Sequence, residues 1–339
     1  MPQTGTVVAP LPATIGGISP RAFAMLLDIV VVMDPIGSIK IAKDSTFAML
    51  LEAQRRGHRL HYVIPGGLFL RDGVAHAHAS PLTVQDDPRA WFELGPVSHL
   101  VLGRGQVLLM RTDPPVDAAY LHDTQILGMA QRAGALVVND PQGLRDMNEK
   151  LTALEFPQCC PPTLVSRDAA AIKAFIAEHG DAVLKTLDGM GGRSIFRARA
   201  GDPNTNVILE TLTEGGRHLA MAQRYIPEIT AGDKRILLVD GVAVDYCLAR
   251  IPQGDEFRGN LAAGGRGEGR PLTDRDRWIA AQVGPEMRRR GMLFVGLDVI
   301  GDYLTEVNVT SPTCIRELDA QFGLNIAGQL FDAIESRLA

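Results

Sequence analysis

The stretch LLDIVVVMDP at residues 26–35 is the first segment of the chain that indicates a fold. Its apolar run over residues 26–33 stops at Asp34, which is typical of a strand buried within a parallel sheet. Asp44 can cap a helix that follows, and a second apolar run comes at residues 60–64. The order of strand, helix and strand predicts a βαβ unit.

The same pattern returns further along the chain. Residues 107–111 and 135–139 have the composition of strands, and residues 117–133 between them have helical spacing. Residues 25–140 therefore predict an open α/β domain. Ligands of such sheets bind beyond the carboxyl ends of the strands, and Asp34 and the segment Arg111–Pro115 lie at such ends. Asp34 is therefore a candidate substrate-binding residue.

A smaller unit follows Pro161 and Pro162, which suggest a linker. We predict strands at residues 163–166, 182–185 and 194–199, a helix at residues 168–178, and further alternation of helix and strand through residues 223–226. The sequence LDGMGG lies at residues 187–192, before the third of these strands. Its glycines would let backbone N–H groups approach a phosphate, and Lys185 adds a positive charge. This segment predicts either a flap over phosphates or an ordinary hairpin turn with a surface lysine.

The C-terminal part is richer in antiparallel strands. Residues 235–240 and 242–250 flank Asp240-Gly241, which is a strong hairpin signal. Arg235 and Arg250 lie on these two strands, and guanidinium groups bind carboxylates and phosphates through two parallel hydrogen bonds. The two arginines therefore predict an anion-binding site, with a solvated sheet face as the alternative.

A long glycine-rich loop is expected at residues 254–270, which show no apolar periodicity. Such a loop in a compact domain is usually functional or disordered. The stretch that begins at Arg258 could close over a reactive intermediate and exclude water, or it could form a flexible surface loop. Thr273 and Asp276 then resemble a capping box, at the start of a helix that ends at Gly291.

Three oxygen-bearing side chains near the C-terminus suggest a metal site. Glu306 and Asn308 share one face of a strand expected at residues 303–309, and their oxygens suit Mg²⁺. Asp298 interrupts the preceding apolar run, and the register decides whether it joins them. A three-residue connection would place Asp298 opposite Glu306, whereas a two-residue connection would place it opposite Thr305. We predict the three-residue connection, with a solvated sheet face as the alternative to metal binding.

Composition argues against several classes of protein. The 339 residues carry 34 Lys and Arg against 39 Asp and Glu, a net charge of −5 that gives no electrostatic argument for nucleic acid. No apolar run reaches the roughly 18 residues of a membrane span. The four cysteines lack CxxC spacing, which favours free thiols in a reducing cytoplasm. No Walker P-loop, GxGxxG, GxSxG or HExxH motif is present. Residues 1–24 are expected to be a disordered tail or a start assigned too early.

Several longer strings resemble one known family, the bacterial glutathione synthetases. The strings follow one another from about Met25 to the C-terminus and are far more specific than the short motifs above. They are MDPI at 33–36, KDS at 43–45, FAMLLEAQRRG at 47–57, NEK at 148–150, LDGMGG at 187–192, RGNLAAGGRGE at 258–268 and TEVNVTSPTC at 305–314.

The resemblance implies an ATP-grasp fold of mixed α/β (α+β) class. Its parts would be an N-terminal substrate-binding α/β domain at residues 25–147, a central lid domain at 148–226 and a C-terminal catalytic domain at 227–339. It also implies that ATP phosphorylates the cysteinyl carboxylate of γ-glutamylcysteine and that the amine of glycine attacks the acyl phosphate, giving glutathione, ADP and phosphate. Two Mg²⁺ ions, with Mn²⁺ as a second candidate, and a cytoplasmic homotetramer are further implications.

The resemblance also gives roles to individual residues. Asp298, Glu306 and Asn308 would hold the metal ions. The nucleotide would contact Lys150, Lys185, Gly191, Gly192, Gln223, Tyr225, Ile226 and Asp233. The catalytic arginines would be Arg235, Arg250 and Arg258, and the substrate would contact Asp34, Arg250 and Ser311.

Two other functions are compatible with the same nucleotide and metal residues. One is a different ATP-grasp ligase, such as an enzyme that joins D-alanine units or adds glutamate to a protein tail. The other is a regulatory module that binds nucleotide without turnover. Such a module should have lost a metal ligand or the lid arginines, and this chain has all of them.

Overall fold

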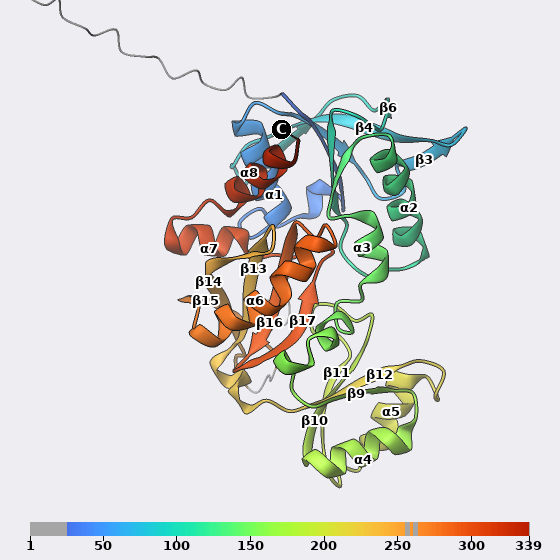
Figure 1. Cartoon of the computed structure of the whole chain (residues 1–339), viewed down its shortest axis with the longest axis vertical. Coiled ribbons are helices and arrows are strands. Elements are labelled where there is room, and N and C mark those ends of the chain that lie inside the picture. Colours follow the sequence, from blue (N-terminus) through green and yellow to red (C-terminus); the bar gives the residue numbers. More distant parts are fainter. Residues whose placement is uncertain (1–25, 255–257, 260–263, 339) are drawn as a thin grey trace, which may run out of the picture.

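The computed structural model describes residues 26–254, 258–259 and 264–338. The tail predicted at residues 1–24 lies outside the described residues. The described chain forms three sheets of eight, four and five strands, which lie at the top, bottom and centre of the ribbon (Figure 1). The predicted mixed α/β class is confirmed.

The first sheet contains the predicted parallel strands. They are β1 (Asp28–Met33), β2 (Arg59–Val63), β7 (Gln106–Arg111) and β8 (Leu136–Val138), and the helices between them include α1 (Ser45–Arg55) and α2 (Ala118–Arg132). Strand β1 is buried on both faces, as its apolar run predicts. Ile29 belongs to the core beneath Phe47 of α1, whereas Val30 belongs to the core beneath Leu127 of α2. The carboxyl ends of β1 and β7 thus lie side by side and carry Asp34 and Asp113 just beyond them.

The first sheet also has an antiparallel half that we do not predict from sequence. It consists of β3 (Leu68–Arg71), β4 (Val74–Val84), β5 (Phe92–Leu94) and β6 (Ser98–Val101). The outer face of this half carries His76, His78 and His99, whose rings stack on Phe69. Strands β3, β5 and β6 are short, and β4 begins with alternating alanine and histidine, so all four give only a weak apolar signal.

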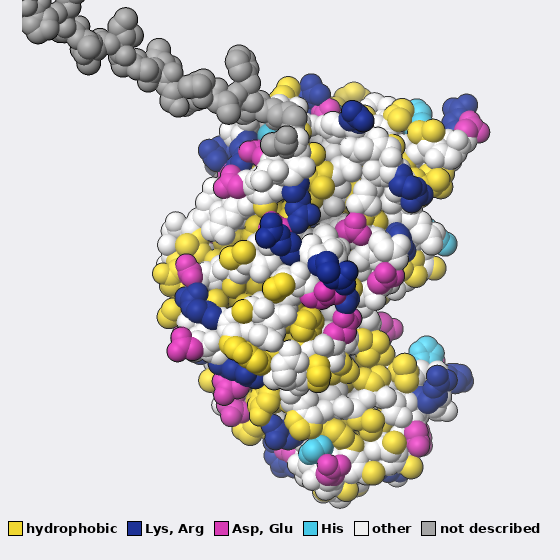
Figure 2. All heavy atoms as spheres, viewed as in Figure 1, with side chains coloured by type: hydrophobic (Ala, Val, Ile, Leu, Met, Phe, Trp, Pro, Cys, Tyr) yellow, Lys and Arg dark blue, Asp and Glu magenta, His cyan; other side chains and the backbone are white. Residues whose placement is uncertain are grey.

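The second sheet forms a separate lobe with its own core. It contains β9 (Thr163–Ser166), β10 (Asp181–Thr186), β11 (Ile195–Arg199) and β12 (Ala220–Arg224), with α4 (Ala169–His179) and α5 (Thr205–Thr213) packed beside it. Ile172, Leu184 and Leu209 belong to a hydrophobic cluster made only of residues from this lobe. Figure 2 shows an indentation in the right-hand outline above this lower lobe.

The third sheet contains the predicted hairpin and capping box. Its strands are β13 (Asp233–Val239), β14 (Val242–Ile251), β15 (Arg266–Pro271), β16 (Phe294–Ile300) and β17 (Tyr303–Asn308), and α6 (Asp274–Arg289) packs against it. Asp240 and Gly241 both have positive φ in the hairpin turn. Thr273 and Asp276 form the capping box of α6. Residues 266–270 are part of a strand rather than of the long loop we expect, because they pair with β14.

The connection between β16 and β17 differs from the prediction. Ile300 pairs with Tyr303, so the connection has two residues instead of three. Asp298 nevertheless pairs with Glu306. A β-bulge between this pair and the neighbouring pair of Val299 with Leu304 shifts the register by one residue. The predicted juxtaposition of Asp298 and Glu306 is therefore confirmed, and the predicted cause is wrong.

The last two helices return to the first sheet. Helices α7 (Ile315–Phe322) and α8 (Ile326–Leu338) both contact α1. Ile326, Leu330 and Phe331 of α8 share one hydrophobic cluster with Phe47 of α1. The shorter helices are η1 (Ile36–Ser38), α3 (Pro141–Asp146), η2 (Thr152–Glu155), η3 (Pro157–Cys159) and η4 (Pro227–Ala231). Among the helices described, none is long and apolar enough to cross a membrane.

Candidate active site

Two adjoining cavities lie where the three sheets meet. A cavity of about 780 Å³ lies between the lower lobe and the third sheet, and one of about 1390 Å³ lies between the third sheet and the ends of β1 and β7. Five residues line both cavities, namely Gly189, Met190, Gly191, Asp298 and Glu306. A molecule in one cavity can therefore reach a molecule in the other at these residues.

The smaller cavity collects every residue that we predict for nucleotide binding. Its lining includes Lys150, Lys185, Gly191, Gly192, Gln223, Tyr225, Ile226 and Asp233. Apolar side chains such as Val183, Ile195 and Ile300 form another part of the wall and suit a planar base. The structure thus favours the phosphate flap over the surface hairpin with an exposed lysine, since Lys185 is 5% exposed.

Two lysines point to the inner end of the smaller cavity. The Nζ atoms of Lys150 and Lys185 each lie 3.6 Å from Glu306 Oε1, and Lys150 also donates to the carbonyl of Gly189 at 2.6 Å. Burial lowers the pKa of Lys185, against the opposing charge of Glu306. Two ammonium groups beside one carboxylate leave a positive charge that phosphate oxygens can neutralise.

Asp233 lies deeper on the same wall. Its Oδ2 accepts a hydrogen bond from Arg250 at 2.5 Å, while its buried Oδ1 has no hydrogen-bond partner among the described residues. Burial raises the pKa of Asp233, although the charge of Arg250 opposes the rise. A buried acceptor without a donor fits a hydroxyl group of a ligand, which agrees with the predicted position near a ribose.

The larger cavity collects the residues predicted for catalysis, substrate and metal, except Arg258, which lines the smaller cavity. Its lining includes Asp34, Arg235, Arg250, Asp298, Glu306, Asn308 and Ser311. Both arginines bind Asp298: Arg235 Nε lies 2.5 Å from Oδ1 and Arg250 Nη2 lies 2.8 Å from Oδ2. Although burial opposes it, these two charges hold the pKa of Asp298 well below its ordinary value. The arginines are 6% and 4% exposed, so the solvated sheet face is wrong for both.

The donor set around Asp298 fits a hard divalent cation. The side chains of Glu306 and Asn308 follow on the same face of β17, and Asn308 donates its amide to Gly296 O at 3.2 Å, which leaves its oxygen as the group that can bind a metal. No group of three or more His, Cys, Asp or Glu among the described residues could hold a metal alone. Here two carboxylates and an amide would share the ion with phosphate oxygens and water.

Close packing around Arg235 requires a glycine at position 296. A Cβ atom built on Gly296 would lie 2.8 Å from Arg235 Cδ and 3.0 Å from Pro312 Cβ. A larger residue there would move the guanidinium away from Asp298.

Arg258 connects the predicted lid to the flap. Its Nη1 donates to the carbonyl of Gly192 at 2.8 Å, across the mouth of the smaller cavity. Residues 255–257 and 260–263 of the predicted lid at 254–267 lie outside the described residues. The contact places Arg258 at the site, as the resemblance implies.

Sequence reasoning misses several residues that line or support the larger cavity. Lys40, Lys43 and Glu149 all line it, and Asp113, from the strand end marked in the sequence, lines it as well. Asp113 follows β7 as Asp34 follows β1, and its backbone N–H donates to Asp34 Oδ2 at 2.9 Å. The rule that sites lie at carboxyl strand ends marks the segment 111–115 with Asp113 in the sequence, although it gives Asp113 no role of its own. Glu149 lies in the string NEK, but the sequence gives it no role of its own, because its side chain bonds residues 309 and 310, far away along the chain.

Three sheets arranged around a nucleotide-sized cavity, with oxygen-bearing side chains that suit a divalent cation beside it, define the class of ATP-grasp enzymes. Solved structures agree: a D-cycloserine synthetase, DcsG, superposes with a TM-score of 0.63 at 16% identity, over 92% of this chain and 100% of that one. The ATP-grasp ligase PsnB, in a complex with a phosphomimetic variant of minimal precursor, Mg and ADP, gives 0.60 at 17% identity, over 92% and 98%. At these identities the likeness concerns the fold alone.

The chain belongs to the prokaryotic glutathione synthetase family. The family's N-terminal domain model matches residues 27–145, and its ATP-grasp domain model matches residues 149–323. A glutathione synthetase of Xanthomonas axonopodis pv. citri (strain 306) is 79% identical over 93% of this chain and 100% of its own length. One of Escherichia coli O157:H7 is 58% identical over 91% and 98%. The resemblance stated from sequence is confirmed.

Proposed function

We propose that the chain joins γ-glutamylcysteine to glycine at the expense of ATP, the reaction named by its family. The observation that carries this proposal is family membership over nearly the whole chain, together with two cavities that meet at Asp298 and Glu306. The smaller cavity suits a nucleoside triphosphate, and the larger one suits a charged peptide. Their shared wall is where a phosphoryl group would pass from one to the other.

The first step activates the cysteinyl carboxylate. A carboxylate oxygen attacks the γ-phosphorus of ATP, the bond to the bridging oxygen breaks, and ADP leaves. Lys150 and Lys185 would stabilise the charge on the phosphates, and Arg235 and Arg250 the charge on the transferring group and the carboxylate. A divalent cation, when bound by Asp298, Glu306 and Asn308, neutralises phosphate charge in the same place.

The second step forms the amide bond. The neutral amine of glycine attacks the carbonyl carbon of the acyl phosphate, phosphate leaves with the bonding electrons, and the nitrogen loses a proton. The guanidinium of Arg235 would stabilise the tetrahedral oxyanion. Because an acyl phosphate hydrolyses readily, the segment around Arg258 would keep water out while glycine binds.

The far end of the larger cavity suits a substrate that carries both charges. Asp34 and Asp113 lie beside one another and contribute two carboxylates. Lys40 and Lys43 line the same cavity and contribute two ammonium groups, and neither lysine forms an ion pair among the described residues. The γ-glutamyl end of the dipeptide bears an α-ammonium and an α-carboxylate, which match these two groups.

The proposed function extends to the metal, the assembly and the location of the protein. The family uses a divalent metal; we propose two Mg²⁺ ions, replaceable by Mn²⁺. We also propose a homotetramer, a cytoplasmic location and domains at residues 25–147, 148–226 and 227–339. The last proposal is supported by the three sheets, whose strands span residues 28–138, 163–224 and 233–308.

Release of ADP by the purified chain tests this function. With Mg²⁺ and ATP, γ-glutamylcysteine plus glycine should give ADP and glutathione in equal amounts, whereas ATP alone or ATP with D-alanine should give little ADP. Absence of ADP with the first pair would overturn the substrate assignment. Release with D-alanine instead would favour another ATP-grasp ligase, and nucleotide binding without any turnover would favour a regulatory module.

A further inference from the structure

The chain directly after Asn308 is held in place by polar groups from elsewhere in the molecule. This segment, residues 309–315, carries Ser311 into the larger cavity. The groups that hold it are the side chains of Ser45, Arg111, Asn139 and Glu149, which bond Ile315 N, Pro312 O, Val309 O and the Val309–Thr310 backbone, respectively. Asp298, Glu306 and Asn308 themselves take no part in these bonds, so the position of the segment is set from outside the metal site.

Glu149 makes more of these bonds than any other described side chain. Its Oε1 accepts from Val309 N at 2.9 Å, Thr310 N at 3.1 Å and Thr310 Oγ1 at 2.9 Å. Its own carbonyl accepts from Val307 N at 2.9 Å. The residue is therefore bonded on both sides of Asn308, to the residue before it and to the two residues after it.

The neighbours of Glu149 extend the same arrangement to the flap. Asn148 donates its amide to Leu187 O at 3.1 Å, and Lys150 donates to Gly189 O at 2.6 Å. The three consecutive residues 148–150 thus connect the phosphate flap to the end of β17. Only Glu149 contacts the segment that carries Ser311.

Bonds on both sides of Asn308 determine where its side chain points. Strand β17 ends at Asn308 and the chain bends at residues 310 and 311, which lets Asn308 and Ser311 both line the larger cavity. A backbone rotation at Val309 would change where these two side chains point. A carboxylate oxygen that accepts three hydrogen bonds fixes this rotation more firmly than a neutral acceptor or water would. Residues that orient metal ligands from behind typically change metal affinity by about 10- to 100-fold when removed.

We propose that Glu149 is a positioning residue for the metal and substrate sites, which aims Asn308 and Ser311 into the larger cavity through its bonds to the backbone on both sides of Asn308. The proposal rests on the proposed function for the identity of the substrate, but not for its effect on the metal.

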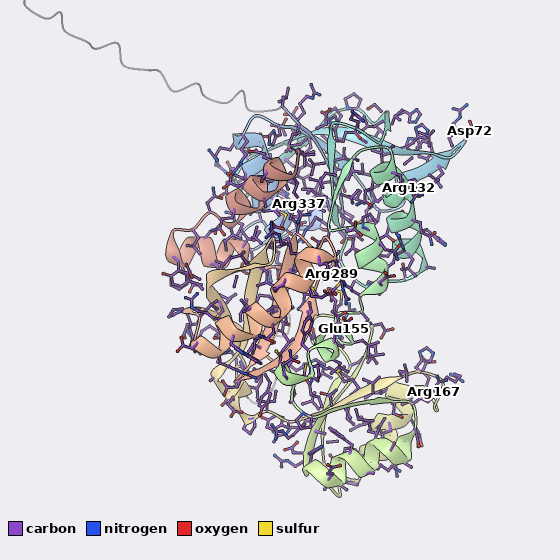
Figure 3. The ribbon with its side chains drawn as sticks, viewed as in Figure 1. Asp72, Arg132, Glu155, Arg167, Arg289 and Arg337 are labelled. Atoms are coloured by element: carbon purple, nitrogen blue, oxygen red, sulfur yellow. The ribbon has the colours of Figure 1, made fainter. Side chains whose placement is uncertain are left out.

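Titration of Mn²⁺ into the full-length protein with saturating ADP, followed by the electron paramagnetic resonance of free Mn²⁺, tests the metal part without any turnover. We expect Glu149→Ala to raise the half-saturating Mn²⁺ concentration by about tenfold or more. Glu149→Gln retains an oxygen that can accept the same bonds and should stay within about threefold of the wild type. Glu155→Ala is the matched control. Glu155 lies shortly after Glu149 in the chain, at the end of η2 (Figure 3), bonds Arg290 and lines neither cavity.

Steady-state kinetics adds a second readout. At saturating metal, Glu149→Ala should raise the KM for γ-glutamylcysteine while the KM for ATP changes by less than about twofold. Equal weakening of Mn²⁺ binding in Glu149→Gln and Glu149→Ala would overturn the proposal, because it would make the charge itself a ligand. A lower melting temperature with unchanged Mn²⁺ affinity and KM would also overturn it, because the role would then be structural.

A variant on the other side of the same bond covers the case in which Glu149→Ala does not fold. Thr310→Val removes one of the three donors and should shift Mn²⁺ affinity in the same direction by a smaller factor; no shift would count against the proposal. If the wild type binds Mn²⁺ with ADP as expected yet releases no ADP with γ-glutamylcysteine and glycine, the proposed function fails and the metal part of this inference stands.

Discussion

At the scale of single residues, Glu306 lies between the nucleotide cavity and the substrate cavity. It lines both cavities and lies 3.6 Å from each of two lysine ammonium groups. Glu306→Ala should lower kcat by at least about 10³-fold, because the metal and the phosphates lose a shared carboxylate. Far-UV circular dichroism should show that the fold persists, since no core volume is removed.

The ligand-free Glu306→Ala protein should also melt at a lower temperature than the wild type. Lys150 and Lys185 are buried and would face each other without a counter-charge. ADP should restore part of the loss by supplying phosphate oxygens. Asp302→Ala, in the exposed turn of the same hairpin, is the control and should keep both activity and melting temperature. If Glu306→Ala turned over normally, the metal site would have to lie elsewhere.

Single residues also show where sequence reasoning ends. Alternation along β17 correctly places Glu306 and Asn308 on one face, because that follows from the pleat alone. The pairing of Asp298 with Glu306 depends on a bulge that is stabilised by Thr305 Oγ1 donating to Asp298 O at 3.1 Å. A bulge leaves no mark in a single sequence, so the correct pair was predicted with the wrong connection.

At the scale of secondary-structure elements, the junction of α7 and α8 should respond to pH. Asp319 Oδ1 accepts from Ile326 N at 3.1 Å and so joins the two helices, and burial raises the pKa of Asp319 to about 6. The folded state therefore holds the proton more tightly than the unfolded chain, in which the pKa is about 4. The contribution of Asp319 to stability is full at low pH and is lost as pH rises from about 4 to about 6.

Asp319→Asn keeps an acceptor for Ile326 and removes the titration. The melting temperature of this variant, relative to the wild type, should rise between about pH 4 and pH 6 and level off above that. Melting followed by circular dichroism across this range measures the difference. Parallel curves for the two proteins would mean that Asp319 is not protonated preferentially in the folded state.

Elements differ in how well the sequence predicts them. The buried strands β1 and β7 and the capped helix α6 are predicted because apolar runs and capping residues are local signals. Strands β3, β5 and β6 are missed because their stability comes from pairing with β4, which in turn pairs with β2, rather than from their own apolar content. β15 is missed for a similar reason: its sequence, RGEGRP, is stabilised by pairing with β14.

At the scale of the whole molecule, the lower lobe should open independently of the rest. Its hydrophobic cluster contains only residues of the lobe, whereas each of the other two clusters contains residues of both the first and the third sheet. Contacts across the boundary include the hydrogen bond from Arg224 to Tyr303 Oη at 3.0 Å and the bonds that residues 148 and 150 make with the flap. Such a unit samples local opening at lower free energy than the main body.

Hydrogen exchange followed by mass spectrometry can measure this difference. Amides of β9 to β12 should exchange faster than those of β1 and β7 in the ligand-free protein. ADP with Mg²⁺ should slow exchange in the lobe more than in the first sheet, because the nucleotide cavity lies between the lobe and the third sheet. Equal protection of both regions, with or without nucleotide, would show that the lobe and the body form one cooperative unit.

The contact between α8 and α1 has a consequence for how a cell makes this protein. A ribosome releases residues 28–63 long before it translates residues 326–338, which supply Ile326, Leu330 and Phe331 to the core around α1. The apolar surface around α1 therefore stays uncovered until residues 326–338 have been made. A chain that stops before residue 326 would leave this surface permanently exposed, and exposed apolar surface promotes aggregation.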